Sequence, residues 1–310
     1  MQVPAILGTF LAGAVGTAVL GLFSRWVDRK VTARVQYRQG PPLLQPLYDI
    51  LKLLGKETLV PLRARHTGFL LAPLVGFAAV AVAGAILWYT AFVPQGAFVG
   101  DLIAVIYLLS IPSLATIVGG TASGNPYGAL GASREMKLMI SYELPLITAV
   151  VAVLVQTRLY SFRLGELASY QQAHGAAALH LSGLLALVVA LFCVQAKLGL
   201  VPFDIPEAET ELMSGPLVEY SGAPLAVFYL MRAMLLAALP LLLITVFMGG
   251  VDPAFPGVLW TLLKYLVLLV LIVLIRNTNT RLRIDHAVKF FWYGLTPLAL
   301  AALLLALAGY

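Results

Sequence analysis

Long apolar runs recur along this chain and restrict its possible folds more than any other feature. Segments of about 18 or more apolar residues with few charges are typical of membrane-spanning helices. Hydrophobic residues make up 61% of the sequence and charged residues only 11%, whereas about a quarter of a soluble domain is charged. The continuous runs therefore predict an all-α, polytopic membrane protein.

The runs predict about eight transmembrane helices within a single integral membrane domain, residues 1–310. We expect spans at about Val3–Phe23, Gly68–Tyr89, Leu102–Gly119, Leu138–Gln156, Leu179–Ala196, Pro224–Phe247, Val258–Ile275 and Phe291–Leu307.

The distribution of lysine and arginine predicts how these spans are oriented. Nine basic residues fall in the first connection and others in the third, fifth and seventh, whereas the opposite connections hold only Arg158 and Arg163. Because cytoplasmic loops carry the excess of lysine and arginine, the odd connections are expected in the cytoplasm and both termini outside. The net charge of +6 is then a signal of topology and does not predict a nucleic-acid partner.

The first connection, residues 24–67, combines a basic collar with an amphipathic segment. In the stretch "LLQPLYDILKLLGKE" (43–57), Asp49, Lys52 and Lys56 lie off one apolar helical stripe, which is formed by Leu43, Leu44, Leu47, Ile50, Leu51 and Leu54. Such a helix is too short to span and can lie in the membrane interface. Two interpretations stay open: an anchor to lipid headgroups, or a docking collar for a soluble partner.

The fifth connection, residues 197–223, is unusually acidic. The stretch "PFDIPEAETELMSGPLVEYSG" (202–222) holds five of the chain's 14 acids: Asp204, Glu207, Glu209, Glu211 and Glu219. The spacing of Asp204 and Glu207 is that of a capping box at a helix start near Pro206. Glu211 would follow Glu207 on the same helical face, where like charges repel, which favours shared protons or basic partners.

Two charged residues are expected at membrane depth. Glu143 follows the start of the fourth span, and Arg232 lies in the middle of the sixth. A charge at the centre of a span costs about 2.5–3.5 kcal/mol on insertion scales and therefore usually faces a cavity or a partner. We expect Arg232 to pair with Glu143 or with an acid of the fifth connection. Glu143 is interpreted either as a proton-exchanging group or as an interfacial carboxylate satisfied by Ser141 or an arginine.

The chain offers little to hold a redox cofactor or a metal. Cys193 is the only cysteine, and the four histidines are scattered along the sequence. Iron–sulfur clusters need several cysteines, so we expect this chain to bind no cofactor or metal and to carry no electrons itself.

Four motifs together resemble a known family. They are "RVQYRQGPPLLQPLYDILKLLGKE" (34–57), "GASREMKLMISYELP" (131–145), the acidic stretch at 202–222, and "RLRIDHAVKFFWYGLTPLAL" (281–300). In this order they resemble the membrane subunit shared by respiratory complex I, where it forms the quinone chamber, and by energy-converting [NiFe] hydrogenases. The resemblance covers nearly the whole chain.

Within that family the sequence resembles the Ech and carbon-monoxide-induced hydrogenase branch. Gly40-Pro41-Pro42 leads directly into Leu43 without the insertion typical of complex I, and "GASRE" is similar to the hydrogenase form. The resemblance implies a non-catalytic subunit of the prokaryotic cytoplasmic (inner) membrane that links electron transfer to H⁺ or Na⁺ translocation. Implied partners are hydrogenase large and small subunits carrying the [NiFe] centre, an iron–sulfur subunit and an antiporter-like membrane subunit.

Two alternatives remain at this stage: a quinone-binding subunit of a complex I-type oxidoreductase, and a stand-alone secondary transporter. The resemblance also suggests roles for two groups of side chains. An ion relay or coupling role is implied for Glu135, Glu143, Asp204, Glu207, Glu209, Glu211, Glu219 and Asp285. Docking or countercharge is implied for Arg25, Arg34, Arg38, Lys52, Arg232, Arg281 and Arg283.

Overall fold

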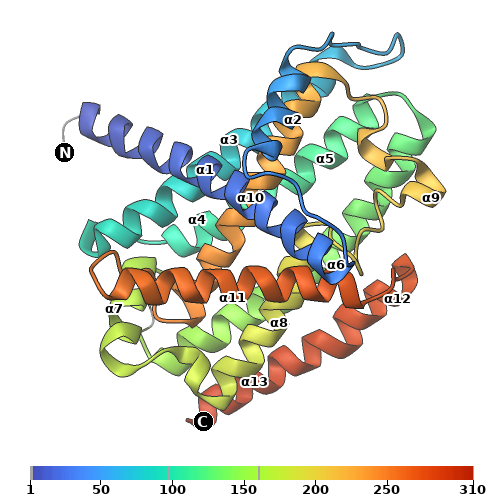
Figure 1. Ribbon diagram of the computed structural model, residues 1–310. Helices are drawn as coiled ribbons and strands as arrows, with labels where there is room; N and C mark the ends of the chain where they lie inside the picture. Colours follow the sequence, from blue (N-terminus) through green and yellow to red (C-terminus); the bar gives the residue numbers. More distant parts are fainter. Residues whose placement is uncertain (1–2, 97, 160, 310) are drawn as a thin grey trace.

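A computed structural model describes residues 3–96, 98–159 and 161–309, without the side chains of residues 3–7, 9 and 209. The described chain is helical (Figure 1). The long apolar helices are α1 (Val3–Val35), α3 (His66–Phe92), α6 (Pro126–Thr157), α10 (Gly222–Phe247) and α11 (Gly257–Thr278). Shorter elements include α7 (Leu164–His174), η1 (Pro94–Gly96) and η2 (Ala177–Leu179).

Helical segments lie at all eight predicted positions. Seven of the described segments are long and apolar enough to cross a membrane, and α8 (Leu181–Lys197) has 17 residues, the lower limit for a span. The third segment is broken into α4 (Asp101–Leu108) and α5 (Ile111–Ala122). The last runs through α12 (Ile284–Lys289), the π-helical η4 (Phe290–Leu295) and α13 (Thr296–Ala308). The prediction of a polytopic all-α membrane protein is confirmed.

Two helix boundaries differ from the predicted ones. α1 continues from the expected end at Phe23 to Val35, and α6 begins at Pro126, well before Leu138. Polar residues end an apolar run without ending a helix, because lysine, arginine and glutamate are good helix formers. Arg25 and Glu135, assigned to connections by the sequence, therefore lie on helices.

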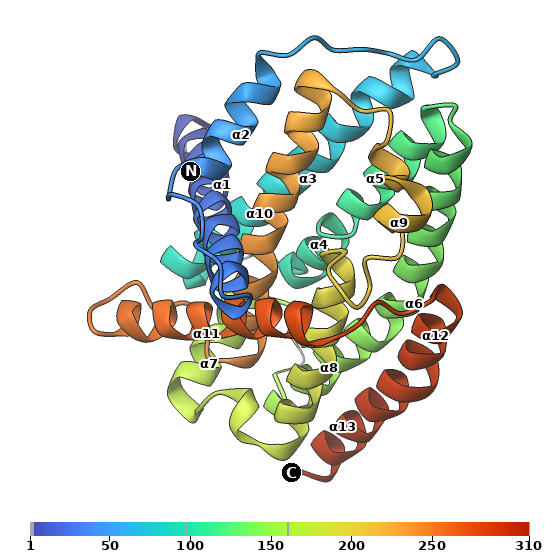
Figure 2. The same ribbon diagram turned by 45° about the vertical axis from the view of Figure 1, so that its right-hand side comes forward.

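Helix α10 lies at the centre of the bundle. All its residues from Ala233 to Phe247 are buried, and it packs against α1, α3 and α8. Figure 2 shows α11 crossing the lower ends of α1 and α10 at a steep angle. Buried Tyr265 on α11 is hydrogen-bonded to Ser24 on α1, which joins these crossing helices.

The predicted amphipathic segment forms α2 (Gln45–Leu54). Its buried residues are Pro46 and Ile50, which face α1 and α10, while Leu51 and Leu54 stay exposed. The Trp26 indole on α1 donates to the carbonyl oxygen of Pro41 at 3.1 Å, so the turn that leads into α2 is attached to α1 as well.

The acidic connection does not form the helix start expected from Asp204 and Glu207. Residues 201–208 run through turns, followed only by α9 (Glu209–Leu212) and the 3₁₀ turn η3 (Gly215–Leu217). No side-chain hydrogen bond caps α9. The capping-box interpretation is wrong, and so is the shared helical face of Glu207 and Glu211. Both fail because the acids contact basic residues of other elements.

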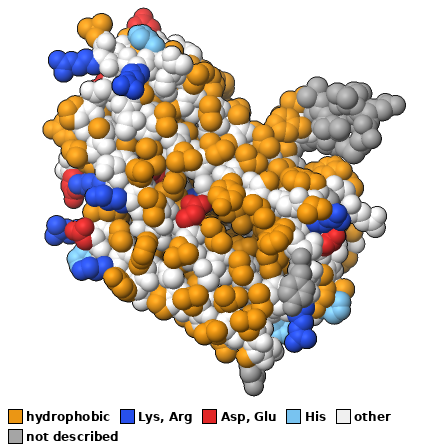
Figure 3. Space-filling view, turned by 180° about the vertical axis from the view of Figure 1, so that it is seen from behind, with side chains coloured by type: hydrophobic (Ala, Val, Ile, Leu, Met, Phe, Trp, Pro, Cys, Tyr) orange, Lys and Arg blue, Asp and Glu red, His pale blue; other side chains and the backbone are white. Residues whose placement is uncertain are grey.

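The outer surface separates apolar from charged side chains. Figure 3 shows apolar side chains over the centre of one face, with lysine, arginine and most acids toward its rims. Exposed apolar residues include Tyr107 on α4, Ile140 and Leu144 on α6, and Leu304 on α13. This pattern fits a protein whose central belt contacts lipid or neighbouring membrane subunits.

Close packing of α1 against α10 yields a stability prediction. A Cβ at Gly21 would lie 2.5 Å from the carbonyl oxygen of Ala233, whereas a Cβ at Gly8 on the same helix would meet nothing within 4 Å. We expect Gly21→Ala to lower the free energy of unfolding by about 1–3 kcal/mol, although alanine favours helix. Gly8→Ala should be neutral or slightly stabilising. Thermal unfolding in detergent checks both, and equal midpoints for the two variants would contradict the close contact.

Candidate functional site

Three ion pairs hold the acidic connection onto the helical bundle. Each joins an acid of residues 204–211 to an arginine from a different part of the chain: Asp204 to Arg281 (2.5 Å), Glu207 to Arg232, and Glu211 to Arg134 (2.7 Å). Arg232 thus pairs with an acid of the cluster, one of the two partners expected. The Glu211 pair is exposed, and its hydrogen bond and charge interaction with Arg134 lower the pKa of Glu211.

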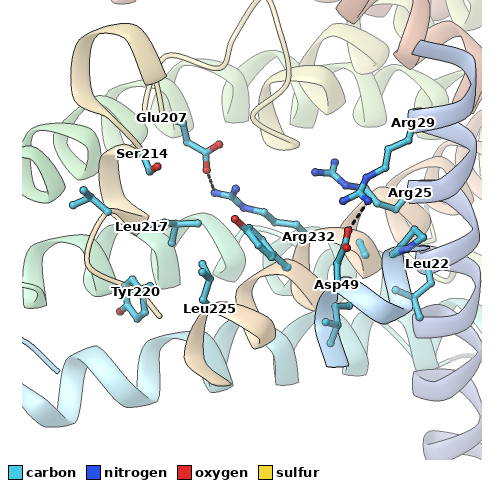
Figure 4. Close-up of a pocket in the computed structure, with 15 residues that line it drawn as sticks. Leu22, Arg25, Arg29, Asp49, Glu207, Ser214, Leu217, Tyr220, Leu225 and Arg232 are labelled. Carbon is cyan, nitrogen blue, oxygen red and sulfur yellow. Dashed lines mark hydrogen bonds and ion pairs between the residues drawn. The ribbon is translucent and has the colours of Figure 1, made fainter. Parts of the chain in front are cut away.

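A cavity of about 390 Å³ opens between α1, α2, α10 and residues 207–220 (Figure 4). Part of its wall is apolar, formed by Leu22, Ile50, Leu217, Leu225 and Tyr229 among others. The rest is charged: Arg25, Arg29, Asp49, Glu207 and Arg232. Ligand cavities of this size commonly combine apolar walls with a few placed polar groups.

The charged wall is held in position by ion pairs. The guanidinium of Arg29 lies 2.6 Å from Asp49 and thereby joins α1 to α2 (Figure 4). Partial burial tends to raise the pKa of Asp49, but hydrogen bonds from Arg29 and Gln45 outweigh it, so this pKa lies below its ordinary value. On the opposite wall, Arg232 projects from α10 toward Glu207 (Figure 4).

Asp28 forms an ion pair with Arg25, a residue that lines the cavity, but does not itself line it. Its carboxylate is 1% exposed, and it lies 2.8 Å from Arg276 on α11 and 3.5 Å from Arg25. Asp28 was not among the residues predicted from the sequence. Its signal was an acid three residues after an arginine within a basic run, a spacing at which helical side chains meet.

A second, smaller cavity of about 40 Å³ adjoins the first. Its lining includes Glu135, Lys197, Glu207 and Arg232. Because Glu207 and Arg232 line both cavities, their ion pair lies between the two. The space is large enough for water, which needs at least about 10–15 Å³ and several polar partners.

Glu143 lies near the middle of α6 and does not contact the residues first expected. It accepts a hydrogen bond from Ser110 at 2.6 Å and lies 3.7 Å from the ammonium of Lys197. Ser141 donates instead to the carbonyl oxygen of Lys137. Sequence reasoning missed Lys197 because it counted this residue with a connection, whereas it ends α8.

The remaining predicted residues lie apart from the cavities. Glu219 accepts a hydrogen bond from Asn125 at 2.5 Å, and the side chain of Glu209 falls outside the described residues. Five predicted residues are exposed and make no ion pair with another described side chain: Arg34, Arg38, Lys52, Arg283 and Asp285.

Comparison with known proteins identifies the family of this chain. The model of the NADH dehydrogenase family matches residues 9–307. The chain belongs to this family. It is 37% identical to an NADH-quinone oxidoreductase subunit of Thermomicrobium roseum, over 95% of this chain and 94% of the relative. It is 35% identical to the subunit of the same name from Syntrophotalea carbinolica, over 98% and 93%.

A solved structure shares the fold. One chain of the membrane-bound sulfane sulfur reductase, an archaeal respiratory membrane complex, superimposes with a TM-score of 0.85 at 31% identity, covering 97% of this chain and 99% of that one. The family resemblance drawn from the four motifs is confirmed. This chain is a multi-pass membrane subunit of a multisubunit respiratory complex.

The Arg29–Asp49 pair gives a pH prediction for the cavity wall. The pKa of Asp49 is lowered in the folded protein. Its ionised carboxylate therefore contributes fully to holding α2 against α1 above about pH 4, and this contribution is lost as the pH falls through the lowered pKa. A spin label at Lys52→Cys should be restrained at pH 7 and become mobile once the pH falls below the lowered pKa of Asp49. In Asp49→Asn it should be mobile at pH 7. Equal restraint at pH 7 in both would contradict the pair's role.

Proposed function

We propose that this chain is the membrane subunit of a complex I-type oxidoreductase, and that it binds quinone in the 390 Å³ cavity while coupling quinone reduction to ion translocation. Its relatives are named as subunits of NADH-quinone oxidoreductases, and these names support the proposal. The observation that carries it is the cavity itself, whose apolar wall adjoins a charged wall beside the acidic connection.

The cavity lining suits the chemistry of a quinone. The ring and its isoprenoid tail are apolar and would lie against Leu22, Ile50 and Leu225. The two carbonyl oxygens gain negative charge as electrons arrive, and guanidinium donors stabilise charge that develops at fixed positions. Arg25 and Arg232 line the cavity and would supply such donors. The electrons would come from a cluster-bearing soluble partner.

The exposed basic residues would form the surface where this partner docks. Arg34 lies in the last turn of α1, Arg38 follows that helix, and Lys52 lies on the exposed side of α2. All three lie on or beside elements that line the cavity, so a subunit bound there would bring its cluster close to the quinone. In this arrangement the docking side faces the cytoplasm and both termini lie outside.

A hydrogenase-type anchor is the second candidate. The direct run of Gly40-Pro41-Pro42 into Leu43 and the likeness to a sulfane sulfur reductase complex favour it. The same surface would then seat the large and small hydrogenase subunits and an iron–sulfur subunit, beside an antiporter-like membrane subunit. In that complex electrons would not pass to a quinone in the cavity.

Narrowing the cavity tests the quinone proposal. Leu225 lines the cavity from α10, so Leu225→Trp should raise the KM for a short-chain quinone several-fold. Electron transfer from the native donor to ferricyanide, which needs no quinone site, should not change. Leu74→Trp is the matched control, because Leu74 is 51% exposed on α3 and does not line this cavity.

The same assay separates the two candidates. Quinone-extracted membranes should lose oxidation of the native donor and regain it when quinone is added back. Undiminished turnover without quinone, together with hydrogen evolution, would instead assign the chain to the hydrogenase type.

Charge reversal tests the docking surface. Arg34→Glu combined with Arg38→Glu should release the cluster-bearing module from membranes while this subunit stays inserted, because the repulsion acts outside the bilayer. The control reverses the same number of charges at Arg158 and Arg163, which lie between the carboxyl end of α6 and the start of α7. This control should leave the module bound. If the module stays bound in both variants, the basic residues serve only to anchor lipid headgroups.

A further inference from the structure

A third cavity, also of about 390 Å³, opens at the end of the bundle away from the acidic connection, and we call it the distal cavity. The carboxyl ends of α6, α7 and α13 form its wall, together with η2 and the residue before α8. Figure 2 shows α7, the start of α8 and the end of α13 together at the lower end of the molecule, away from α2 and α9. Helix α6 is long and apolar enough to cross a membrane. Because α6 begins beside Glu219 and ends at the distal cavity, this cavity lies at the opposite membrane surface.

Three basic side chains line the distal cavity, and none of its described lining residues is acidic. Arg158 directly follows α6 and makes no ion pair with a described residue. His180 comes directly before α8, and its ring makes no hydrogen bond to a described residue. The ring of His174 stacks on Tyr170 with centroids 4.2 Å apart, which holds this imidazole in place. Basic groups without an acidic partner suit an anionic ligand.

The donors of these side chains match the oxygens of a phosphate. Arginine presents its N–H groups in a fixed fork that fits phosphate geometry, and a protonated imidazole donates from both ring nitrogens. His174 Nδ1 lies 3.1 Å from the carbonyl oxygen of Tyr170, so its Nε2 is the nitrogen free to contact a ligand. Arg158 would make the main phosphate contact, and the two imidazoles would add further donors.

Gln156 adds a requirement that a simple anion does not meet. Its Nε2 donates to the carbonyl oxygen of Ala177 at 3.3 Å, whereas its Oε1 is buried without a hydrogen-bond partner among the described residues. A buried acceptor without a partner is unfavourable, and only a donor such as a hydroxyl group satisfies it. Gln156 lines the distal cavity together with Arg158. A ligand that carries both a phosphate and hydroxyl groups would therefore fit best.

Two exposed apolar stripes lead away from the distal cavity along α8 and α13. The stripe on α8 consists of Leu181, Leu184 and Val188, and the stripe on α13 consists of Leu300, Leu304 and Leu307. Spacings of three and four residues put these side chains on one face of each helix, and the two helices pack against each other. The first stripe starts directly after His180, and the second ends two residues before Gly309, which lines the cavity. A polar anion site thus adjoins two surfaces that suit acyl chains.

We propose that the distal cavity binds the headgroup of an anionic phospholipid of the phosphatidylglycerol type. The phosphate lies against Arg158, His174 and His180, a glycerol hydroxyl donates to Gln156 Oε1, and the acyl chains lie along α8 and α13. A free phosphate would make only the first of these contacts. A lipid bound in this way joins the ends of α6, α7, α8 and α13, and it stabilises the bundle because it binds only the folded state. This site is independent of the proposed electron acceptor.

Lipid selectivity beside α8 tests the site. A fluorophore on Leu184→Cys reports lipid contact there, because Cys193, the only native cysteine, is buried. With the full chain in phosphatidylcholine vesicles, brominated phosphatidylglycerol should quench this fluorophore several-fold more strongly than brominated phosphatidylcholine. Arg158→Gln should remove this preference. Arg163→Gln is the matched control and should keep it, since Arg163 is paired with Glu166 at 2.9 Å and does not line the cavity.

Three outcomes would overturn the proposal. Equal quenching by the two lipids in the unsubstituted background would show that α8 contacts lipid without selectivity. Loss of the preference on adding inorganic phosphate at constant ionic strength would assign the cavity to a free anion. Native mass spectrometry of the assembled complex provides the third: equal retention of phosphatidylglycerol by Arg158→Gln and Arg163→Gln would mean that a neighbouring subunit, not lipid, covers this face. If Arg158→Gln fails to insert, His180→Gln at an exposed position should lower the preference, and an unchanged preference would again overturn the site.

Discussion

The cost of placing charge in an apolar environment governs this structure. A bundle with so few charged residues cannot leave a carboxylate or guanidinium unpaired at depth, because an isolated buried ion is strongly unfavourable. Three of the buried or half-buried acids accordingly meet a cation: Asp28 meets Arg276, Glu207 meets Arg232, and Glu143 lies beside Lys197. Buried Asp101 instead accepts hydrogen bonds from the backbone N–H groups of Leu102 and Leu164. These contacts fix where helices from distant parts of the sequence meet.

Pairing also determines the shape of the acidic connection. Its local sequence, with Pro202, Pro206 and Pro216, offers no long helix. The ion pairs instead attach the connection to α6, α10 and the segment before α12 at separate points. An ion pair that is broken on one side leaves a costly charge behind, so a redox-driven change near one pair has consequences for the next. These linked contacts support the coupling role proposed for the connection.

The two cavities follow from the same constraint. The Glu207–Arg232 pair projects between them, with the charged wall of the larger cavity on one side and Glu135 and Lys197 on the other. Polar groups that line a space can be hydrated, which lowers the cost of keeping them charged at depth. The polar residues inside this otherwise apolar bundle therefore line two adjoining cavities, from the wall of α1 and α2 to Glu135 on α6.

The sequence by itself determined the fold class, the positions of eight helical segments and the amphipathic helix α2, because apolar runs and helical periodicity are local properties. It also identified Glu143, Arg232 and the acidic connection, since charges in apolar surroundings are visible without a structure. Only the tertiary structure decided the partners. Lys197 was counted with a connection, Asp28 was overlooked, and the helix start expected near Pro206 did not form. These depend on which helices approach one another, and the free energy of a charge is set by neighbours far away in sequence.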